Sequence, residues 1–149
     1  MVTILVTGHR GFIGGHLITK LSQKGYKVTK LMGDITKPKT ILGCANDCDI
    51  VIHLAAKLMD NPFDKSHYEV NVNGTKNLLK EARKSNSKFI FISTAGVYGP
   101  CEHANEDSPV NPKSPYEKTK FEAEGYVKES GLDYVILRPG LIFGPNDKR

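Results

Sequence analysis

The chain has 149 residues and is 39% hydrophobic, which is enough for one domain with a core and too short for two domains of ordinary size. Its net charge of +5 arises from lysines and arginines that are scattered rather than interleaved with aromatic residues, so we expect no nucleic-acid partner. No apolar run approaches the ~18 residues of a membrane span and no signal peptide precedes the first strand, so we expect a cytoplasmic protein without membrane contact.

The cysteines favour reduced thiols over a disulfide framework. There are three cysteines, so at least one stays unpaired in any disulfide scheme, and they lack the spacing to histidine that zinc ligands show: Cys44, Cys48 and Cys101. We therefore expect no metal site.

A phosphate-binding turn is predicted between the first strand and the first helix. Residues 3–6 form a continuous apolar run typical of a strand in a parallel sheet, and apolar residues then recur at helical spacing. Between them, Gly8 allows a tight turn, Gly11 a close backbone approach to a pyrophosphate, and Gly14 close packing of the helix on the strand. Free N–H groups at the start of such a helix attract phosphate, so this turn predicts a dinucleotide site.

The second strand and the region after it are more polar. Residues 27–32 predict a strand near an edge of the sheet, and Thr36 as N-cap with Pro38 in the first turn predicts a helix. Residues 49–56 predict a buried strand that ends in small side chains. We interpret His53 in this strand as a hydrogen-bonded core residue, because a lone histidine in an apolar strand is more often that than a catalytic group.

The rest of the chain keeps alternating between helix and strand. Residues 57–68 predict a loop over the active-site edge, and residues 69–85 predict a helix that turns Val72, Leu79 and Ala82 toward the sheet. The remaining predicted elements are a strand at 88–94, a helix from 115 to Gly131 and a strand at 134–137.

The helix from 115 has an explicit start signal. Ser114 is its predicted N-cap, Pro115 takes the first helical position, and Glu117 completes a capping box. Strands that alternate with helices predict an α/β, Rossmann-like doubly wound parallel sheet with right-handed crossovers. In such a sheet, ligands bind at the carboxyl ends of the strands.

Tyr116 and Lys120 are four residues apart, so on this helix they lie on one face, one turn apart. An ammonium beside a phenol favours the phenolate and lowers its pKa from ~10 toward the range of a general base. From the spacing alone, a surface tyrosine beside a solvated lysine is the alternative.

The segment Thr-Gly-His-Arg-Gly-Phe-Ile-Gly at residues 7–14 resembles the extended short-chain dehydrogenase/reductase family, whose NAD(P)-dependent nucleotide-sugar epimerases, reductases and dehydratases carry Thr-Gly-x-x-Gly-Phe-Ile-Gly. In that family, a segment like Gly-Asp-Ile-Thr at residues 33–36 ends the third strand. The resemblance therefore implies a sheet shortened by one helix and one strand after the second strand. The resemblance extends over residues 1–149. It implies that they form an NAD(P)-binding Rossmann domain, which is the cofactor-binding half of the family's proteins without their C-terminal substrate lobe.

The resemblance also implies roles for three catalytic residues. Tyr116 is the acid/base on a sugar hydroxyl or carbonyl, Lys120 tunes it and bonds the nicotinamide ribose, and Thr94 orients the substrate and Tyr116. Thr94 is preferred to Ser93 because it lies four residues before Tyr98, as in the family. The residues expected to contact the cofactor are Gly8, Arg10, Gly11, Phe12, Ile13, Gly14, Asp34, Ile35, Leu54, Ala55, Ala56, Tyr116 and Lys120.

NADP is the cofactor that we predict over NAD. A carboxylate roughly 20 residues after the glycine turn would select NAD, whereas an arginine nearby would accommodate the 2′-phosphate of NADP. Met32 occupies the end of the second strand, and Arg10 lies in the turn. If that strand end is shifted by two residues, Asp34 becomes the ribose ligand and the preference reverses. Otherwise Asp34 and the Ile35 backbone serve the adenine, as the resemblance implies.

Two functions stay open. The first is an NAD(P)-dependent nucleotide-sugar epimerase or reductase, and dehydration is disfavoured because Ala95 and Gly96 stand where the family's 4,6-dehydratases carry an acidic pair. The second is a non-catalytic dinucleotide-binding module. The resemblance also implies a homodimer paired through the helices at 69–85 and 115–130. We expect the 149 residues to bind the cofactor but to turn over nucleotide-sugars poorly.

Overall fold

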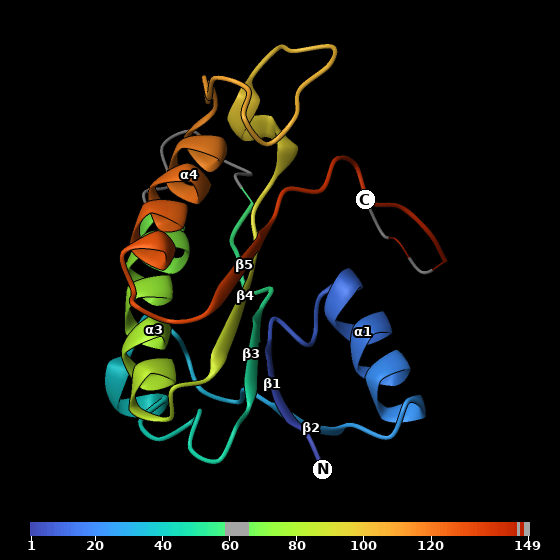
Figure 1. Cartoon of the computed structure of the whole chain (residues 1–149), viewed down its shortest axis with the longest axis vertical. Helices are drawn as coiled ribbons and strands as arrows, with labels where there is room; N and C mark the ends of the chain where they lie inside the picture. The colour runs from blue at the N-terminus through green and yellow to red at the C-terminus, as the bar shows by residue number, and fades with distance from the viewer. Residues whose placement is uncertain (59–65, 146, 148–149) are drawn as a thin grey trace.

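The structure, a computed structural model, describes residues 1–58, 66–145 and 147, which form a five-stranded sheet with helices on both faces (Figure 1). The strands are β1 (Thr3–Thr7), β2 (Lys27–Lys30), β3 (Ile50–His53), β4 (Lys88–Ile92) and β5 (Tyr134–Leu137). They lie in the order β2-β1-β3-β4-β5, and each neighbouring pair is parallel. The chain starts inside the sheet, builds toward one edge, then crosses back past β1 toward the other. This confirms the predicted doubly wound, Rossmann-like sheet.

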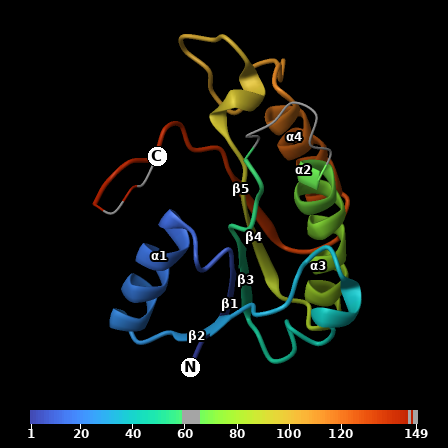
Figure 2. The same ribbon diagram turned by 180° about the vertical axis from the view of Figure 1, so that it is seen from behind.

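The helices form the two outer layers. α1 (Phe12–Gln23) lies on one face of the sheet, whereas α3 (Thr75–Lys84) and α4 (Pro115–Lys128) lie on the other, as both views show (Figures 1 and 2). The chain enters α3 through the short α2 (Ser66–Tyr68) and a π-helical stretch, η2 (Glu69–Gly74). Two turns of 3₁₀ helix are η1 (Pro38–Thr40) and η3 (Ala95–Tyr98).

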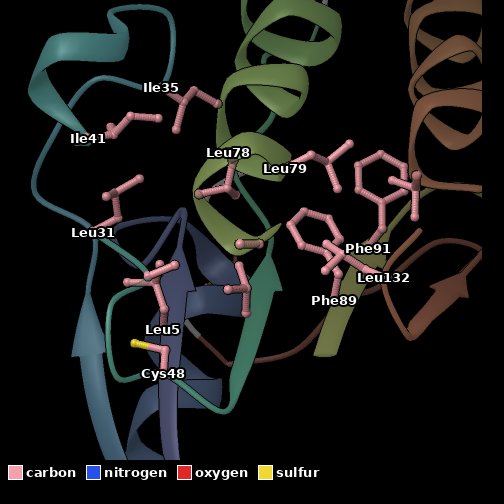
Figure 3. Close-up of a cluster of buried hydrophobic side chains, with 14 of the residues drawn as sticks. Leu5, Leu31, Ile35, Ile41, Cys48, Leu78, Leu79, Phe89, Phe91 and Leu132 are labelled. Atoms are coloured by element: carbon pink, nitrogen blue, oxygen red, sulfur yellow. The ribbon is translucent and has the colours of Figure 1, made fainter. Parts of the chain in front are cut away.

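The core has two parts because the side chains of a strand alternate between its faces. On the side of α3 and α4, Phe89 and Phe91 of β4 are fully buried beside Leu79 (Figure 3). The cluster on the side of α1 consists of Ile4, Val6 and Ile52, with partly buried Leu17, Ile18 and Leu21 packed against it. Burial on both faces explains the continuous apolar runs of the central strands.

The region between β2 and β3 departs from the prediction. Instead of a helix capped by Thr36, it holds the single turn η1, whose N-cap is Lys37. The Oδ1 atom of Asp34 accepts hydrogen bonds from the Thr36 amide at 3.0 Å and the Thr36 hydroxyl at 2.8 Å. The predicted helix start was wrong because this local turn engages the side chain that was to cap it. The described residues contain no further strand between β2 and β3, in keeping with the predicted shortening.

The second half of the chain follows its prediction more closely. Residues 59–65 of the predicted loop lie outside the described residues, and Ser66–Tyr68 is helical rather than loop. The side chains predicted to face the sheet from the next helix are buried, namely Val72, Leu79 and Ala82. The capping box of α4 is confirmed: the Ser114 hydroxyl accepts from the Glu117 amide at 3.2 Å, and the Glu117 carboxylate accepts from the Ser114 amide at 2.8 Å.

Candidate functional site

The turn between β1 and α1 is shaped by contacts that leave no room for side chains. Gly8 has a φ of +67°, and a Cβ atom there would lie 2.7 Å from the Ala55 amide nitrogen. A Cβ atom on Gly14 would lie 2.3 Å from the Gly8 carbonyl oxygen, so α1 packs directly on the turn. Gly11 is the N-cap of α1, and no described side chain caps this helix. The helix therefore offers backbone donors and the positive end of its dipole to an anion.

A cleft of about 1030 Å³ opens beside this turn, at the carboxyl ends of the strands. Its walls also include residues that follow β3 and β4, the start of α4, and the segment after β5, which runs toward the N-terminal end of α1 (Figure 1). Ligand sites commonly have volumes of roughly 300–1,000 Å³, so this cleft suits a large, extended ligand. The predicted site residues in its lining are Gly8, Arg10, Gly11, Phe12, Ile13, Gly14, Leu54, Ala56, Thr94 and Tyr116.

A smaller cleft of about 390 Å³ lies on the other side of the glycine turn and includes Asp34, Ile35 and Ala55 in its lining. Arg10 lines both clefts and is exposed. The Asp34 carboxylate is engaged by the Thr36 hydroxyl and amide, which hold its pKa below the usual value, and Lys37 Nζ is 3.5 Å away. Asp34 thus lines the cleft with its Oδ1 atom bonded inside its own turn and its Oδ2 atom 3.5 Å from Lys37 Nζ.

Thr94 and Tyr116 lie in the wall of the same large cleft. The Thr94 hydroxyl oxygen accepts a hydrogen bond from the Gly96 amide at 3.1 Å and so caps η3. Tyr116 is half-buried, and this burial raises the pKa of its phenol above the usual value. Among the hydrogen bonds of the described residues, none joins Thr94 to Tyr116. The structure therefore brings the two hydroxyls to one cleft as separate groups.

Lys120 lies beneath the cleft rather than in its described lining, and it is only 2% exposed. Its Nζ atom is 4.0 Å from the centroid of the Phe91 ring, a cation–π contact. Burial lowers the pKa of the ammonium to about 7, against the opposing effect of Glu124. The expected lowering of the Tyr116 pKa is not found, because the ammonium faces the Phe91 ring and readily loses its proton, while burial disfavours the phenolate.

His53 is a core residue, as predicted. Its Nδ1 atom lies 2.7 Å from the Thr7 hydroxyl oxygen, and its Nε2 atom lies 2.9 Å from the Thr75 hydroxyl oxygen. The Thr75 hydroxyl donates to the Asn71 carbonyl at 2.7 Å, so it accepts from the Nε2–H group of the histidine. Complete burial, with a further effect of Lys120, lowers the pKa of His53 to about 3. The neutral ring therefore links β1, β3 and α3.

Sequence reasoning missed part of the cleft lining. Ser93, at the end of β4, was set aside for its neighbour, and its buried hydroxyl oxygen has no hydrogen-bond partner among the described residues. Its position directly after a strand was the available signal, because a parallel sheet binds ligands there. The other missed lining residues of the two clefts include His9, Gly15, His16, Thr19, Gly33, Leu58, Val70, Ile92, Gly96, Pro139, Gly140, Leu141, Ile142 and Asp147.

Disulfides, metal-binding clusters and membrane-spanning helices are further features that could indicate a function. All three cysteines are free thiols, and the described residues contain no cluster of three or more His, Cys, Asp or Glu side chains placed to hold a metal ion. Over the same part of the chain, no helix combines the length and the apolar character needed to span a bilayer.

Known proteins resemble this chain over almost its whole length. The model of the NAD dependent epimerase/dehydratase family matches residues 4–149. A putative UDP-glucose 4-epimerase from Methanocaldococcus jannaschii is 34% identical, over 95% of this chain and 56% of that protein.

Solved structures agree with this match. The Bordetella bronchiseptica enzyme WbmH in complex with NAD+ superimposes with a TM-score of 0.90 at 29% identity, covering 100% of this chain and 59% of that chain. RMD from Pseudomonas aeruginosa complexed with NADPH superimposes with a TM-score of 0.87 at 27% identity, covering 99% of this chain and 56% of that chain. The chain spans about half the length of the curated relatives it matches. On the family match and the fold, the chain belongs to the NAD dependent epimerase/dehydratase family.

Proposed function

We propose that the chain forms the NAD(P)-binding domain of a nucleotide-sugar epimerase or reductase in which Tyr116 is the acid/base. The observation that carries the proposal is that Thr94 and Tyr116 line the same cleft as the uncapped N-terminus of α1. The backbone-only contacts at Gly8 and Gly14 fit a cradle for a pyrophosphate. Relatives named as UDP-glucose 4-epimerases support the nucleotide-sugar class.

The dinucleotide and the chain divide the chemistry between them. When bound, the nicotinamide supplies the group that accepts or returns a hydride. The glycine turn holds the pyrophosphate, and Thr94 orients the sugar oxygen. Because burial raises the Tyr116 pKa, the phenol keeps its proton at neutral pH and can donate it to a sugar carbonyl oxygen. The reverse step needs the phenolate, which the ammonium of Lys120, one turn further along α4, would stabilise if it turned from the Phe91 ring toward Tyr116.

NADP is our proposed cofactor. Arg10 is exposed in the wall of both clefts, where it can meet a 2′-phosphate, whereas the Asp34 carboxylate that would select NAD is bonded to Thr36. Charge-assisted hydrogen bonds are worth about 1.5–3 kcal/mol, so Arg10→Ala should weaken NADP binding by roughly 10- to 100-fold. Lys24→Ala, at the far end of α1, is the control. Calorimetric titration should show NAD binding unchanged in both variants; tighter binding of NAD than NADP to the wild type would refute the assignment.

A non-catalytic dinucleotide-binding module is the second candidate, favoured by the burial of Lys120 away from the cleft lining. The decisive assay takes the protein expressed from its complete reading frame, with NAD or NADP and a panel of UDP-, GDP- and dTDP-sugars. Epimerised or reduced sugar product supports the enzyme. Tight dinucleotide binding without turnover of any sugar in the panel supports the module.

A further inference from the structure

Beneath the cleft, three side chains from different elements form a charged assembly that we call the Arg138 bridge: Tyr98, Glu124 and Arg138. The Arg138 guanidinium donates to both carboxylate oxygens of Glu124, at 2.9 Å from Nε and 2.6 Å from Nη2. Its Nη1 atom donates to the Tyr98 hydroxyl oxygen at 2.7 Å, and the guanidinium lies 4.8 Å from the centroid of the Tyr98 ring. Glu124 is completely buried, whereas the Arg138 side chain is 15% exposed, so the carboxylate is the enclosed end of the assembly.

Each member of the bridge connects through a short length of chain to a part of the candidate site. Tyr98 ends η3, the turn that Thr94 caps. Arg138 directly follows β5 and precedes the segment that lines the large cleft. Glu124 lies on α4, one turn beyond Lys120 and on the same face. The bridge therefore fixes the helix that carries the acid/base pair relative to two cleft walls, and its bidentate geometry specifies orientation as well as distance.

The surroundings of Lys120 make Glu124 electrostatically important. Phe91 lies against the ammonium from β4, His53 faces it from β3 in its neutral form, and Tyr116 is one turn earlier on α4. Glu124 is the group that favours the charged ammonium in these apolar surroundings. Without a nearby negative charge, an ammonium this deeply buried would exist mainly as a neutral amine at neutral pH.

The carboxylate of Glu124 in turn needs cations to remain ionised. Arg138 supplies the main one through the two hydrogen bonds, and Lys128 Nζ lies 3.9 Å away at the helix surface. A buried ion pair is an inefficient way to stabilise a fold, since well-packed apolar side chains of similar volume often do as well or better. Anchoring α4 alone would therefore not require this arrangement.

We propose that Glu124 is a positioning residue: held by Arg138 and Tyr98 on the same face of α4 as Lys120 and one turn beyond it, its carboxylate favours the charged form of Lys120. The inference rests on the proposed function, because it assigns a purpose to the charge of Lys120. It can nevertheless be tested on the chain without any dinucleotide or sugar.

The test is an NMR titration of the Lys120 side chain in isotopically labelled protein. Glu124→Gln keeps the shape of the side chain and removes its charge, so the Lys120 titration midpoint should fall by about one pH unit. Asp133→Asn is the matched control, because it removes the carboxylate of an exposed ion pair with Lys88 at 3.0 Å and should leave the midpoint unchanged. A folded Glu124→Gln variant with the wild-type midpoint would overturn the proposal.

Glu124→Gln also leaves the partly buried Arg138 without its counter-charge and is expected to destabilise the fold. The double variant Glu124→Gln/Arg138→Gln removes both charges and is compared with Arg138→Gln, from which it differs only at Glu124. Its Lys120 midpoint should be the lower of the two, and equal midpoints in these two variants contradict the proposal just as firmly. Dinucleotide binding by the wild type is measured on the same sample. Its absence would refute the proposed function while leaving the titration as a separate test of Glu124.

Discussion

Gly14 is the position where one added methyl group should separate α1 from the glycine turn. A Cβ atom there would lie 2.3 Å from the Gly8 carbonyl oxygen and 2.8 Å from His9 Cα, and these backbone atoms cannot rotate away as a side chain could. Overpacking typically costs about 1–3 kcal/mol. Alanine in a helix interior recovers about 0.5–1 kcal/mol relative to glycine. Because the clash is with backbone atoms, we place the cost in the upper part of its range, about 2–3 kcal/mol, and expect Gly14→Ala to lose about 1–2.5 kcal/mol of unfolding free energy.

The matched control is Gly125→Ala, because a Cβ atom at that interior position of α4 would meet nothing within 4 Å. For a domain of this size, 1 kcal/mol shifts the melting temperature by about 2–4 °C. On that scale, Gly14→Ala should melt about 2–10 °C lower than the wild type and Gly125→Ala about 1–4 °C higher. Calorimetric titration should show dinucleotide binding lost in the first variant and kept in the second. A Gly14→Ala protein with wild-type stability and affinity would refute the steric argument.

Three further predictions concern pH, assembly and turnover. Because the pKa of His53 falls from 6.5 to about 3 on folding, the unfolded chain binds the proton first, so the free energy of unfolding should drop as the pH falls through this range. In urea melts at neutral pH and near pH 4.5, the drop should be smaller in His53→Gln than in the wild type, and an equal drop would contradict the assignment. Two copies should pair through α3 and α4, so light scattering at tens of micromolar should give the mass of a dimer, and a monomer mass would count against it. The 149-residue polypeptide should bind a dinucleotide yet turn over nucleotide-sugars poorly, because contacts to the parts of a substrate that do not react normally orient its reacting carbon. Efficient turnover that Tyr116→Phe abolishes would contradict this prediction and show that the 149 residues form a complete site.

The features that the sequence predicted well are local structures set by residues a few positions apart in the chain. Three glycines between an apolar strand and an amphipathic helix predicted the turn, and Ser114 with Glu117 predicted the start of α4. The parallel, doubly wound sheet followed from the alternation of strands and helices, because parallel strands need crossovers and crossovers have a fixed hand. The convergence of residues at the strand ends followed from the same rule.

The features that sequence reasoning missed depend on contacts between distant segments. The Tyr116 phenol was expected to be acidified by a lysine one turn away, but the lysine stem carries its ammonium to the Phe91 ring of β4. The link between Glu124 and Arg138 joins a helix to the end of a strand, and no local pattern announces it. The sequence also did not show which of two local motifs would form at Thr36, a helix N-cap or a turn closed by the Asp34 side chain. The turn formed.

The most direct test of the proposed chemistry is to measure turnover and dinucleotide affinity of Tyr116→Phe in the protein expressed from its complete reading frame. Tyr126→Phe, on the same helix but outside the described cleft lining, is the matched control. Positioned acid–base groups commonly contribute about 10²–10⁴-fold to rate, so we predict that Tyr116→Phe loses at least 100-fold in kcat. Its dinucleotide affinity should fall by no more than about 10-fold, the cost of one lost hydrogen bond. A Tyr116→Phe enzyme that turns over its sugar as fast as Tyr126→Phe would contradict the role of Tyr116 as the acid/base.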